Sequence, residues 1–292
     1  MTTTNLQERD PMPTFDTPGP IAAMLTVIGG DVRISAGDRT STTVTVEPTD
    51  PDNEEDRKAA EQTRVELTGD QLVVKVPRLR SWLPRSTGGS IDLTVELPAG
   101  SRVHAGAALA DFATDGPLGE CRIKTSLGQI RVEQADTVSL RTSIGDIALD
   151  RATGHAEVTA GSGEIRVREL ESTGVIKNSN GDTWVGRATG DLRVSAANGN
   201  IAIDVAQAGV VAKSANGDVR LGEAVRNTVV LETKLGDLEV GIPEGTAAWL
   251  DVRAAAGRVR NALEAADSPG PSAETVEVRA RTTAGDVVIR RP

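Results

Sequence analysis

Apolar and polar residues alternate along most of the chain, a period of two that is typical of β-strands. In the N-terminal third the alternation is seen in "LTVIGGDVRIS", "TTVTVEP", "TRVELTGDQLVVKVP" and "SIDLTVELPAG". Gly, Asp and Pro separate these runs, and "DNEEDRKAAEQ" has the composition of one short helix. The pattern predicts a strand-rich N-terminal region.

From about residue 110 a fixed period appears, in which a glycine precedes an acidic or amide residue and an apolar-x-apolar triplet. The motif recurs as "GQIRV", "GDIAL", "GEIRV", "GDTWV", "GNIAI", "GDVRL" and "GDLEV", with spacings of 17, 18, 18, 18, 18 and 19 residues. A second apolar triplet lies midway in each period. Two short strands cannot bury their own apolar face, but stacked coils can, which predicts an all-β fold: a parallel two-sheet β-solenoid of about 18-residue coils with a strand-rich N-terminal cap.

Each coil needs a corner residue that accepts a positive φ, and glycine does so without steric cost. The acidic or amide residue after it is expected to bond the backbone of its own turn. Acids at this position would stack, and neighbours about 4.8 Å apart repel by about 1 kcal/mol in water. Bound cations would relieve the repulsion, but no coil has the Gly-rich nonapeptide of the calcium-binding β-roll, so water-exposed turn acids are favoured. These acids are Asp146, Glu164, Asp182, Asp218 and Asp237.

Alternation also assigns a face to each position, because successive side chains of a strand point to opposite sides. Positions +2 and +4 from the repeat glycines should point inward, as should the apolar pairs of the other half-coil. The predicted inner pairs are Ile130/Val132, Ile147/Leu149, Ile165/Val167, Thr183/Val185, Ile201/Ile203, Val219/Leu221 and Leu238/Val240, with Cys121/Ile123, Val138/Leu140, Ala156/Val158, Gly174/Ile176, Leu192/Val194, Val210/Ala212 and Val229/Leu231 opposite. The +3 column then faces outward, and it contains Trp184.

Trp184 is one of three tryptophans, and the chain has no tyrosine. Counting places Arg166 one coil below it and Arg220 two coils above it. A large ring in an outward column, bracketed by arginines and alanines, is typical of an interaction patch. Arg166, Trp184 and Arg220 are therefore candidate interaction residues, although a covering C-terminal segment or a self-association contact is a more ordinary explanation than a ligand site.

Two further features suggest contact surfaces. The loop "RLRSWLPRSTGGS" places Trp82 among Arg80 and Arg85, either to touch a partner or membrane surface or to cap an open end of the solenoid, which is the favoured alternative. Four basic residues, Lys124, Arg141, Lys177 and Lys213, lie four positions before repeat glycines. They form a partial outward ladder for a polyanion, but a solvated face is favoured because the whole chain is acidic.

Composition limits the function classes. Aromatic residues make up 2% of the chain, so the core must be built from small aliphatic residues. The net charge of −10 argues against binding to nucleic acid or anionic membranes. No segment approaches the roughly 20 apolar residues of a membrane span, which excludes stable membrane insertion, and neither a signal peptide nor a wall anchor is visible, so a cytoplasmic location is expected.

No catalytic constellation is apparent. The single cysteine, Cys121, falls in an inner column and is expected to be a buried hydrophobic residue. Neither His104 nor His155 has an evident partner, and the metalloprotease, nucleophile-elbow and phosphate-loop motifs are missing. We predict no enzymatic activity, no cofactor and no metal site.

The repeats, together with "MPTFDTPGPI", "GECRIKTSLGQIRV", "VIKNSNGDTWVG", "LRVSAANGNI" and the closing "ETVEVRARTTAGDVVIRRP", resemble the DUF4097 family of β-strand-repeat proteins labelled "putative adhesin". The resemblance covers nearly the whole chain from Pro11 and rests on the serial Gly-Asp/Asn-apolar repeats. It implies a β-solenoid-like fold without an established activity, in a chain of actinobacterial type.

The predicted organisation is a flexible tail over 1–20, a β-strand cap over 21–105 and a solenoid with C-terminal closure over 106–292, the last two forming one continuous domain. "GDVVIRRP" should form the last rung, with arginines and proline protecting its edge. The predicted function is a non-catalytic protein-interaction or scaffold module whose partner is another protein or a second copy. The alternatives are a self-assembling scaffold resembling bactofilin and, less favoured, a carbohydrate-active β-helix enzyme.

Overall fold

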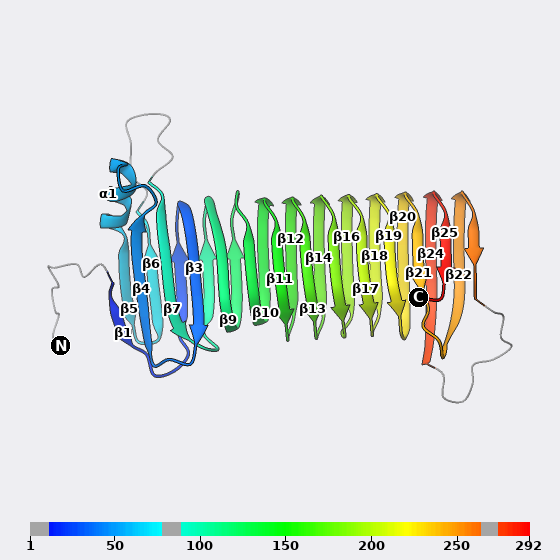
Figure 1. Cartoon of the computed structure of the whole chain (residues 1–292), viewed down its shortest axis with the longest axis horizontal. Helices are drawn as coiled ribbons and strands as arrows, with labels where there is room; N and C mark the ends of the chain where they lie inside the picture. Colours follow the sequence, from blue (N-terminus) through cyan, green and yellow to red (C-terminus); the bar gives the residue numbers. More distant parts are fainter. Residues whose placement is uncertain (1–11, 78–88, 264–273) are drawn as a thin grey trace. The chain divides into compact units, whose positions relative to one another are not determined.

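The computed structural model describes residues 12–77, 89–263 and 274–292. Within these residues the chain forms twenty-five strands and one helix, α1 (Glu54–Gln62), which confirms the all-β prediction (Figure 1). The chain divides into two compact units, one ending at Glu133 and one running from Gln134 to Pro292.

Two series of hydrogen-bonded strands make up the first unit. One runs β1–β4–β7–β3–β9 and the other β5–β6–β2–β8–β9, with the two ends of the long strand β9 serving one series each. The strands are β1 (Thr14–Asp16), β2 (Ala22–Thr26), β3 (Gly29–Gly37), β4 (Ser41–Pro48), β5 (Arg64–Thr68), β6 (Gln71–Lys75), β7 (Ile91–Pro98), β8 (Arg102–Gly106) and β9 (Leu109–Lys124). The first coil in sequence, β2 and β3, thus lies between two later coils, with parallel neighbours on both sides.

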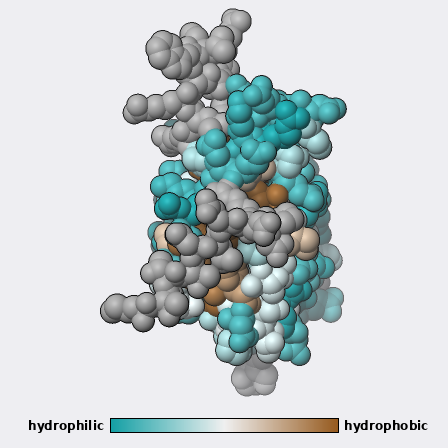
Figure 2. Space-filling model, turned by 90° about the vertical axis from the view of Figure 1, so that its left-hand side faces the viewer, coloured by the Kyte–Doolittle hydropathy of each residue, from teal (hydrophilic) through white to brown (hydrophobic). Residues whose placement is uncertain are grey.

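Antiparallel strands and α1 close one edge of the first unit. β4 and β5 run antiparallel to β7 and β6, and α1 connects them. Asn53 caps the helix by accepting from the Glu55 N–H at 2.9 Å, and Asp56 accepts from the Ser90 N–H at 2.8 Å, which ties the helix to the start of β7. This end faces the viewer in Figure 2, where a small hydrophobic area lies among hydrophilic residues.

The second unit is a stack of parallel coils, which confirms the solenoid prediction. Strands alternate between a series β10–β12–β14–β16–β18–β20 and a series β11–β13–β15–β17–β19–β21, and most partners are 18 residues apart. The strands are β10 (Ile130–Ile144), β11 (Ile147–Ala152), β12 (Ala156–Ser162), β13 (Ile165–Leu170), β14 (Gly174–Asn180), β15 (Thr183–Ala188), β16 (Leu192–Asn198), β17 (Ile201–Ala206), β18 (Val210–Asn216), β19 (Val219–Ala224), β20 (Asn227–Leu235) and β21 (Leu238–Gly241).

The predicted inner columns form the core of these coils. Every residue of the predicted inner pairs is buried, including Thr183 and Gly174. Ile165 and Val167 are fully buried from one series, and Ala156 and Val158 from the other. Full burial of each Val, Leu or Ile stabilises the fold by about 1.5–3 kcal/mol, so two such stripes account for the cohesion of the stack.

Two constraints require glycine at the corners. The sequence indicated the positive φ but not the close approach of the neighbouring corner. Gly163 has φ +142°, as expected, and Gly217 has φ +144°. In addition, a Cβ on Gly163 would lie 2.1 Å from the carbonyl oxygen of Gly145, and one on Gly217 would lie 2.1 Å from that of Gly199. Successive corners therefore stack so closely that no side chain fits between them.

The turn residues after these glycines bond the next coil, so the expectation that they bond their own turn is wrong. Asp182 Oδ1 accepts from the Asn200 N–H at 2.8 Å, and Asn200 Oδ1 accepts from the Asp218 N–H at 2.9 Å. At these corners an amide that would otherwise be left unpaired gains an acceptor from the coil before it. The carboxylates that accept such bonds, those of Asp146, Asp182, Asp218 and Asp237, are thus held by backbone amides, which offset their mutual repulsion.

The C-terminal strands do not form the last rung, so that prediction is wrong. β24 (Glu274–Ala284) lies between β20 and β22 (Thr246–Ala256), and β25 (Val287–Arg290) lies between β21 and β23 (Val259–Asn261) (Figure 1). β22 and β23 therefore form the outer rung. The inner positions of the inserted rung are filled by valine, isoleucine and alanine, and these side chains are buried because the rung has neighbours on both sides.

The double constraint on the corners gives a prediction for Gly217→Ala. A positive φ alone costs a residue with Cβ about 1–2 kcal/mol, and the contact with Gly199 should raise the loss in unfolding free energy above about 3 kcal/mol. Gly245→Ala is the matched control, because Gly245 also has φ +83° but nothing lies within 4 Å of its added Cβ. Urea unfolding of both variants would measure the difference, and equal losses would show that the stacking contact is unimportant.

Candidate interaction surface

Trp184 lies on the outward side of β15, in register with both predicted arginines. It pairs with Arg166 on β13 and with Ala202 on β17, and Ala202 pairs in turn with Arg220 on β19. The structure therefore brings Arg166, Trp184 and Arg220 into one outward column, in the order that the repeat predicts. Whether this column binds anything stays a prediction.

Two contacts hold the indole ring of Trp184 in place. Its Nε1 donates to Asp204 Oδ1 on the next coil at 3.3 Å. A Cβ built on Gly186 would lie only 3.1 Å from Cη2 of the ring, so the indole lies over Gly186 on its own strand. Because the ring covers a position without a side chain, it can lie close to the sheet, and Trp184 is half-buried. We call Arg166, Trp184, Gly186, Asp204 and Arg220 the Trp184 face.

The arginines of the Trp184 face have carboxylate neighbours but stay exposed. Arg166 Nε lies 2.8 Å from Glu164 Oε1, and Arg220 Nε lies 3.7 Å from Glu239 Oε2. Their side chains are 65% and 59% exposed. Exposed ion pairs contribute at most about 1 kcal/mol, so either guanidinium can exchange its partner for a carboxylate on another molecule at little cost.

Trp82, Arg80 and Arg85, the other candidate contact residues, lie outside the described residues. Their role and the capping alternative for their loop stay predictions.

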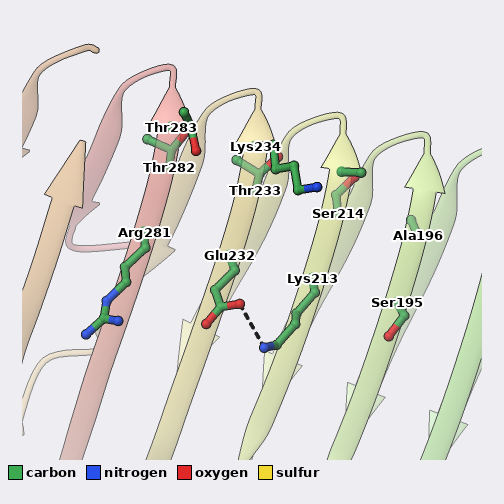
Figure 3. Close-up of a pocket in the computed structure, with 11 residues that line it drawn as sticks. Ser195, Ala196, Lys213, Ser214, Glu232, Thr233, Lys234, Arg281, Thr282 and Thr283 are labelled. Carbon is green, nitrogen blue, oxygen red and sulfur yellow. Dashed lines mark ion pairs between the residues drawn. The ribbon is translucent and has the colours of Figure 1, made fainter. Parts of the chain in front are cut away.

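Lys213 of the predicted basic ladder lines a groove of about 560 Å³ on the opposite series of strands (Figure 3). Ser195, Lys213, Glu232 and Arg281 follow one another in register across β16, β18, β20 and β24. Lys213 Nζ is paired with Glu232 Oε2 at 2.7 Å. A carboxylate thus interrupts the ladder and neutralises one of its cations, which supports the solvated-face interpretation over a polyanion track.

Both histidines have polar neighbours that sequence alone did not indicate. His104 Nε2 lies 3.2 Å from Glu120 Oε1, and His155 Nδ1 lies 2.8 Å from Thr173 Oγ1 one coil on. Thr173 is 18 residues after His155, so the repeat spacing predicts this neighbour.

Within the described ranges, no group of three or more His, Cys, Asp or Glu side chains is placed to hold a metal ion.

Cys121 is fully buried, as its inner column predicts. Burial raises the pKa of its thiol to about 12, and the nearby Glu120 carboxylate adds to the shift. The nucleophilic form of cysteine is the thiolate, which such a high pKa disfavours, so Cys121 acts as a core side chain in the folded protein.

No helix in the part of the chain that the structure describes has the length and apolarity to span a bilayer.

Comparison with known proteins gives one family match. The family described as Toastrack DUF4097 matches residues 24–290. No curated protein matches the chain significantly.

Several solved structures are similar over almost their full length at low identity. A "putative adhesin" from Parabacteroides merdae is 11% identical, with 94% of this chain and 95% of the other covered and a TM-score of 0.40. A "putative lipid binding protein" from Parabacteroides distasonis is 11% identical, with 96% of both chains covered and a TM-score of 0.41. A "putative adhesin" from Bacteroides fragilis is 10% identical, with 96% of both chains covered and a TM-score of 0.33.

The burial of Cys121 gives a prediction for its reactivity. With a pKa of about 12, the thiolate fraction at pH 8 is on the order of one part in ten thousand, and the thiol is out of reach of reagents. A chromogenic disulfide reagent should therefore modify no thiol in native buffer and one thiol per chain in concentrated urea. Rapid modification in native buffer would contradict the structure around β9.

Proposed function

The chain belongs to the Toastrack DUF4097 family, whose fold is a β-solenoid, and on that premise we propose that it is a non-catalytic interaction module that binds a protein partner through the Trp184 face. The cytoplasmic location and the actinobacterial type predicted from the sequence stay predictions.

The observation that carries this proposal is the immobilised, half-exposed indole of Trp184. Tryptophan and arginine are enriched among the residues that dominate binding energy at protein interfaces. The ring is already fixed by Asp204 and Gly186, so a partner that packs against it need not order the side chain, which lowers the entropic cost of association.

The surroundings of the ring indicate the chemistry of the partner. The outward positions around the ring carry small residues that project little from the sheet: Gly186, Ala202 and Gly222. Arg166 and Arg220 are three coils apart, about 14 Å along the stack. A complementary partner would present an apolar side chain to the indole, flanked on both sides by carboxylates that reach the two guanidinium groups.

The pairing of the nearby acids favours binding over catalysis. Asp204 accepts from the Trp184 indole, and Glu164 is held by Arg166. A carbohydrate-active enzyme needs two carboxylates free to donate a proton and to attack or activate water. The carboxylates closest to the Trp184 ring are instead engaged with the residues of the face itself.

A self-assembling scaffold is the second candidate, and a different observation favours it. The outer rung of the second unit, β22 and β23, has a paired neighbour on one side only among the described residues. A self-assembling scaffold should keep increasing in mass as its concentration rises, whereas an interaction module should not grow beyond a small fixed number of copies.

The proposal is tested with a Trp184→Ser/Arg166→Ser variant used as bait in co-purification from the organism that encodes the chain. Both changes are on the outward side, so circular dichroism should show an unchanged fold. A protein retained by wild type should be lost by the variant, and its purified form should bind the variant at least about tenfold more weakly.

The matched control is Val175→Ser/Lys177→Ser, an outward apolar and basic pair on β14 of the opposite series. This variant should retain the same protein as wild type. Equal retention by both variants would contradict the proposed role of the Trp184 face.

A further inference from the structure

The outer rung of the second unit ends in an open strand edge. Among the described residues, β22 pairs with β24 alone and β23 with β25 alone. Along the eleven residues of β22, alternate N–H and C=O groups are directed to the outer side of this edge strand, where none of the described residues forms a ladder with them. Such an edge is a template for pairing with another strand.

Side chains of the outer rung show the same incompleteness. Leu250 and Val252 continue the inner columns of Val278 and Ala280, but they are only half-buried, whereas Val278 and Ala280 are fully buried. Val259 on β23 is 44% exposed although it continues a buried column. The rung presents core-type residues to whatever lies beyond it.

We propose that this edge pairs with the same edge of a second copy of the chain, so that β22 runs antiparallel to β22 of the partner around a two-fold axis at Val252. The inference concerns a different surface from the Trp184 face and does not depend on the proposed function.

Charge complementarity selects both the occupant and the register. The outward side of β22 carries Asp251 and Arg253 two residues apart, with Val252 between them on the inward side. With the axis at Val252, Asp251 of each copy lies opposite Arg253 of the partner subunit, which makes two cross-strand ion pairs. An axis at Asp251 or at Arg253 would place like charges opposite each other, which is destabilising.

The existing contacts keep these side chains available. Asp251 is held by Arg281 at 3.1 Å, which positions its carboxylate on the outward side. Arg253 lies 3.6 Å from Asp251, and its side chain is 75% exposed. Its guanidinium can therefore turn to the partner without breaking a buried interaction.

The two-fold arrangement limits the assembly to two copies. An isologous contact uses the same surface on both chains, so each edge is covered by the other and none is left for a third copy. The packing also brings Val252 against Val252 of the partner subunit and Leu250 near Ala254 of the partner subunit, which covers the half-buried inner columns.

A cross-linking experiment on the full chain tests the axis. In Val252→Cys the two introduced thiols would face each other as a directly opposed antiparallel pair, at Cα–Cα distances of about 4.5–5.5 Å that allow a disulfide. Oxidation at micromolar protein should convert most of the chain to a covalent dimer. The native Cys121 is fully buried and should not contribute.

Ala248→Cys is the matched control, on the same side of the same strand. In the proposed register its two copies would be eight positions apart, about 27 Å, and cannot be bridged. A monomeric Val252→Cys product, or equal cross-linking of both variants, overturns the proposal.

Charge reversal tests the register without a covalent bond. In sedimentation equilibrium the wild type should fit a monomer–dimer equilibrium, and Arg253→Asp should raise the dimer dissociation constant at least about tenfold by replacing two attractions with two repulsions. The exchanged double variant Asp251→Arg/Arg253→Asp should recover most of the wild-type affinity. A wild type that is monomeric at all concentrations, or that grows beyond two copies, overturns the proposal.

The Trp184→Ser/Arg166→Ser variant separates this inference from the proposed function. It should dimerise as wild type does, because it leaves β22 unchanged. Loss of dimerisation in this variant would place the self-contact on the Trp184 face and overturn the edge pairing.

Discussion

The close stacking of the corner glycines is the constraint on which the second unit depends. At Gly217 the chain passes so near the carbonyl oxygen of Gly199 that a side chain is excluded, and the Asn200 side chain after Gly199 accepts a hydrogen bond from the backbone of the next coil. Because the corners can stack in a single arrangement, they fix the register of every strand between them. Inner side chains therefore align with inner ones, and outward side chains form straight columns.

The fixed register explains why so much of this unit could be predicted from sequence. A constant spacing between glycines places residues 18 positions apart side by side, so counting was enough to assign Ile165 and Val167 to the core and Trp184 to the surface. It did not reveal the order of the terminal rungs. The inserted rung β24–β25 has the same alternation as any coil, and parallel rungs with equivalent inner columns can exchange places without changing their local pattern.

The candidate site, too, could be predicted from the sequence only in part. The column of Arg166, Trp184 and Arg220 follows from spacing, and extending the count to the position two residues on would have placed Gly186 and Asp204 beside the ring. The carboxylate partners of the arginines could not be read in this way, because long side chains choose among several neighbours by rotamer. Arg166 pairs with Glu164 in the turn just before its own strand, whereas Arg220 reaches Glu239 on the next coil.

A repeat that makes each coil complete its neighbour leaves the outermost coil incomplete, and the two units resolve this differently. In the first unit β4 and β5 reverse direction and α1 joins them, which ends the parallel series with antiparallel strands. In the second unit the edge strand β22 keeps the parallel direction, the length and the inner columns of its interior neighbour β24. An edge strand built like an interior strand gains the most stability from pairing with another strand. An antiparallel copy of β22 is the partner whose charges match. The regularity that stabilises the stack therefore also determines where the chain meets a second copy.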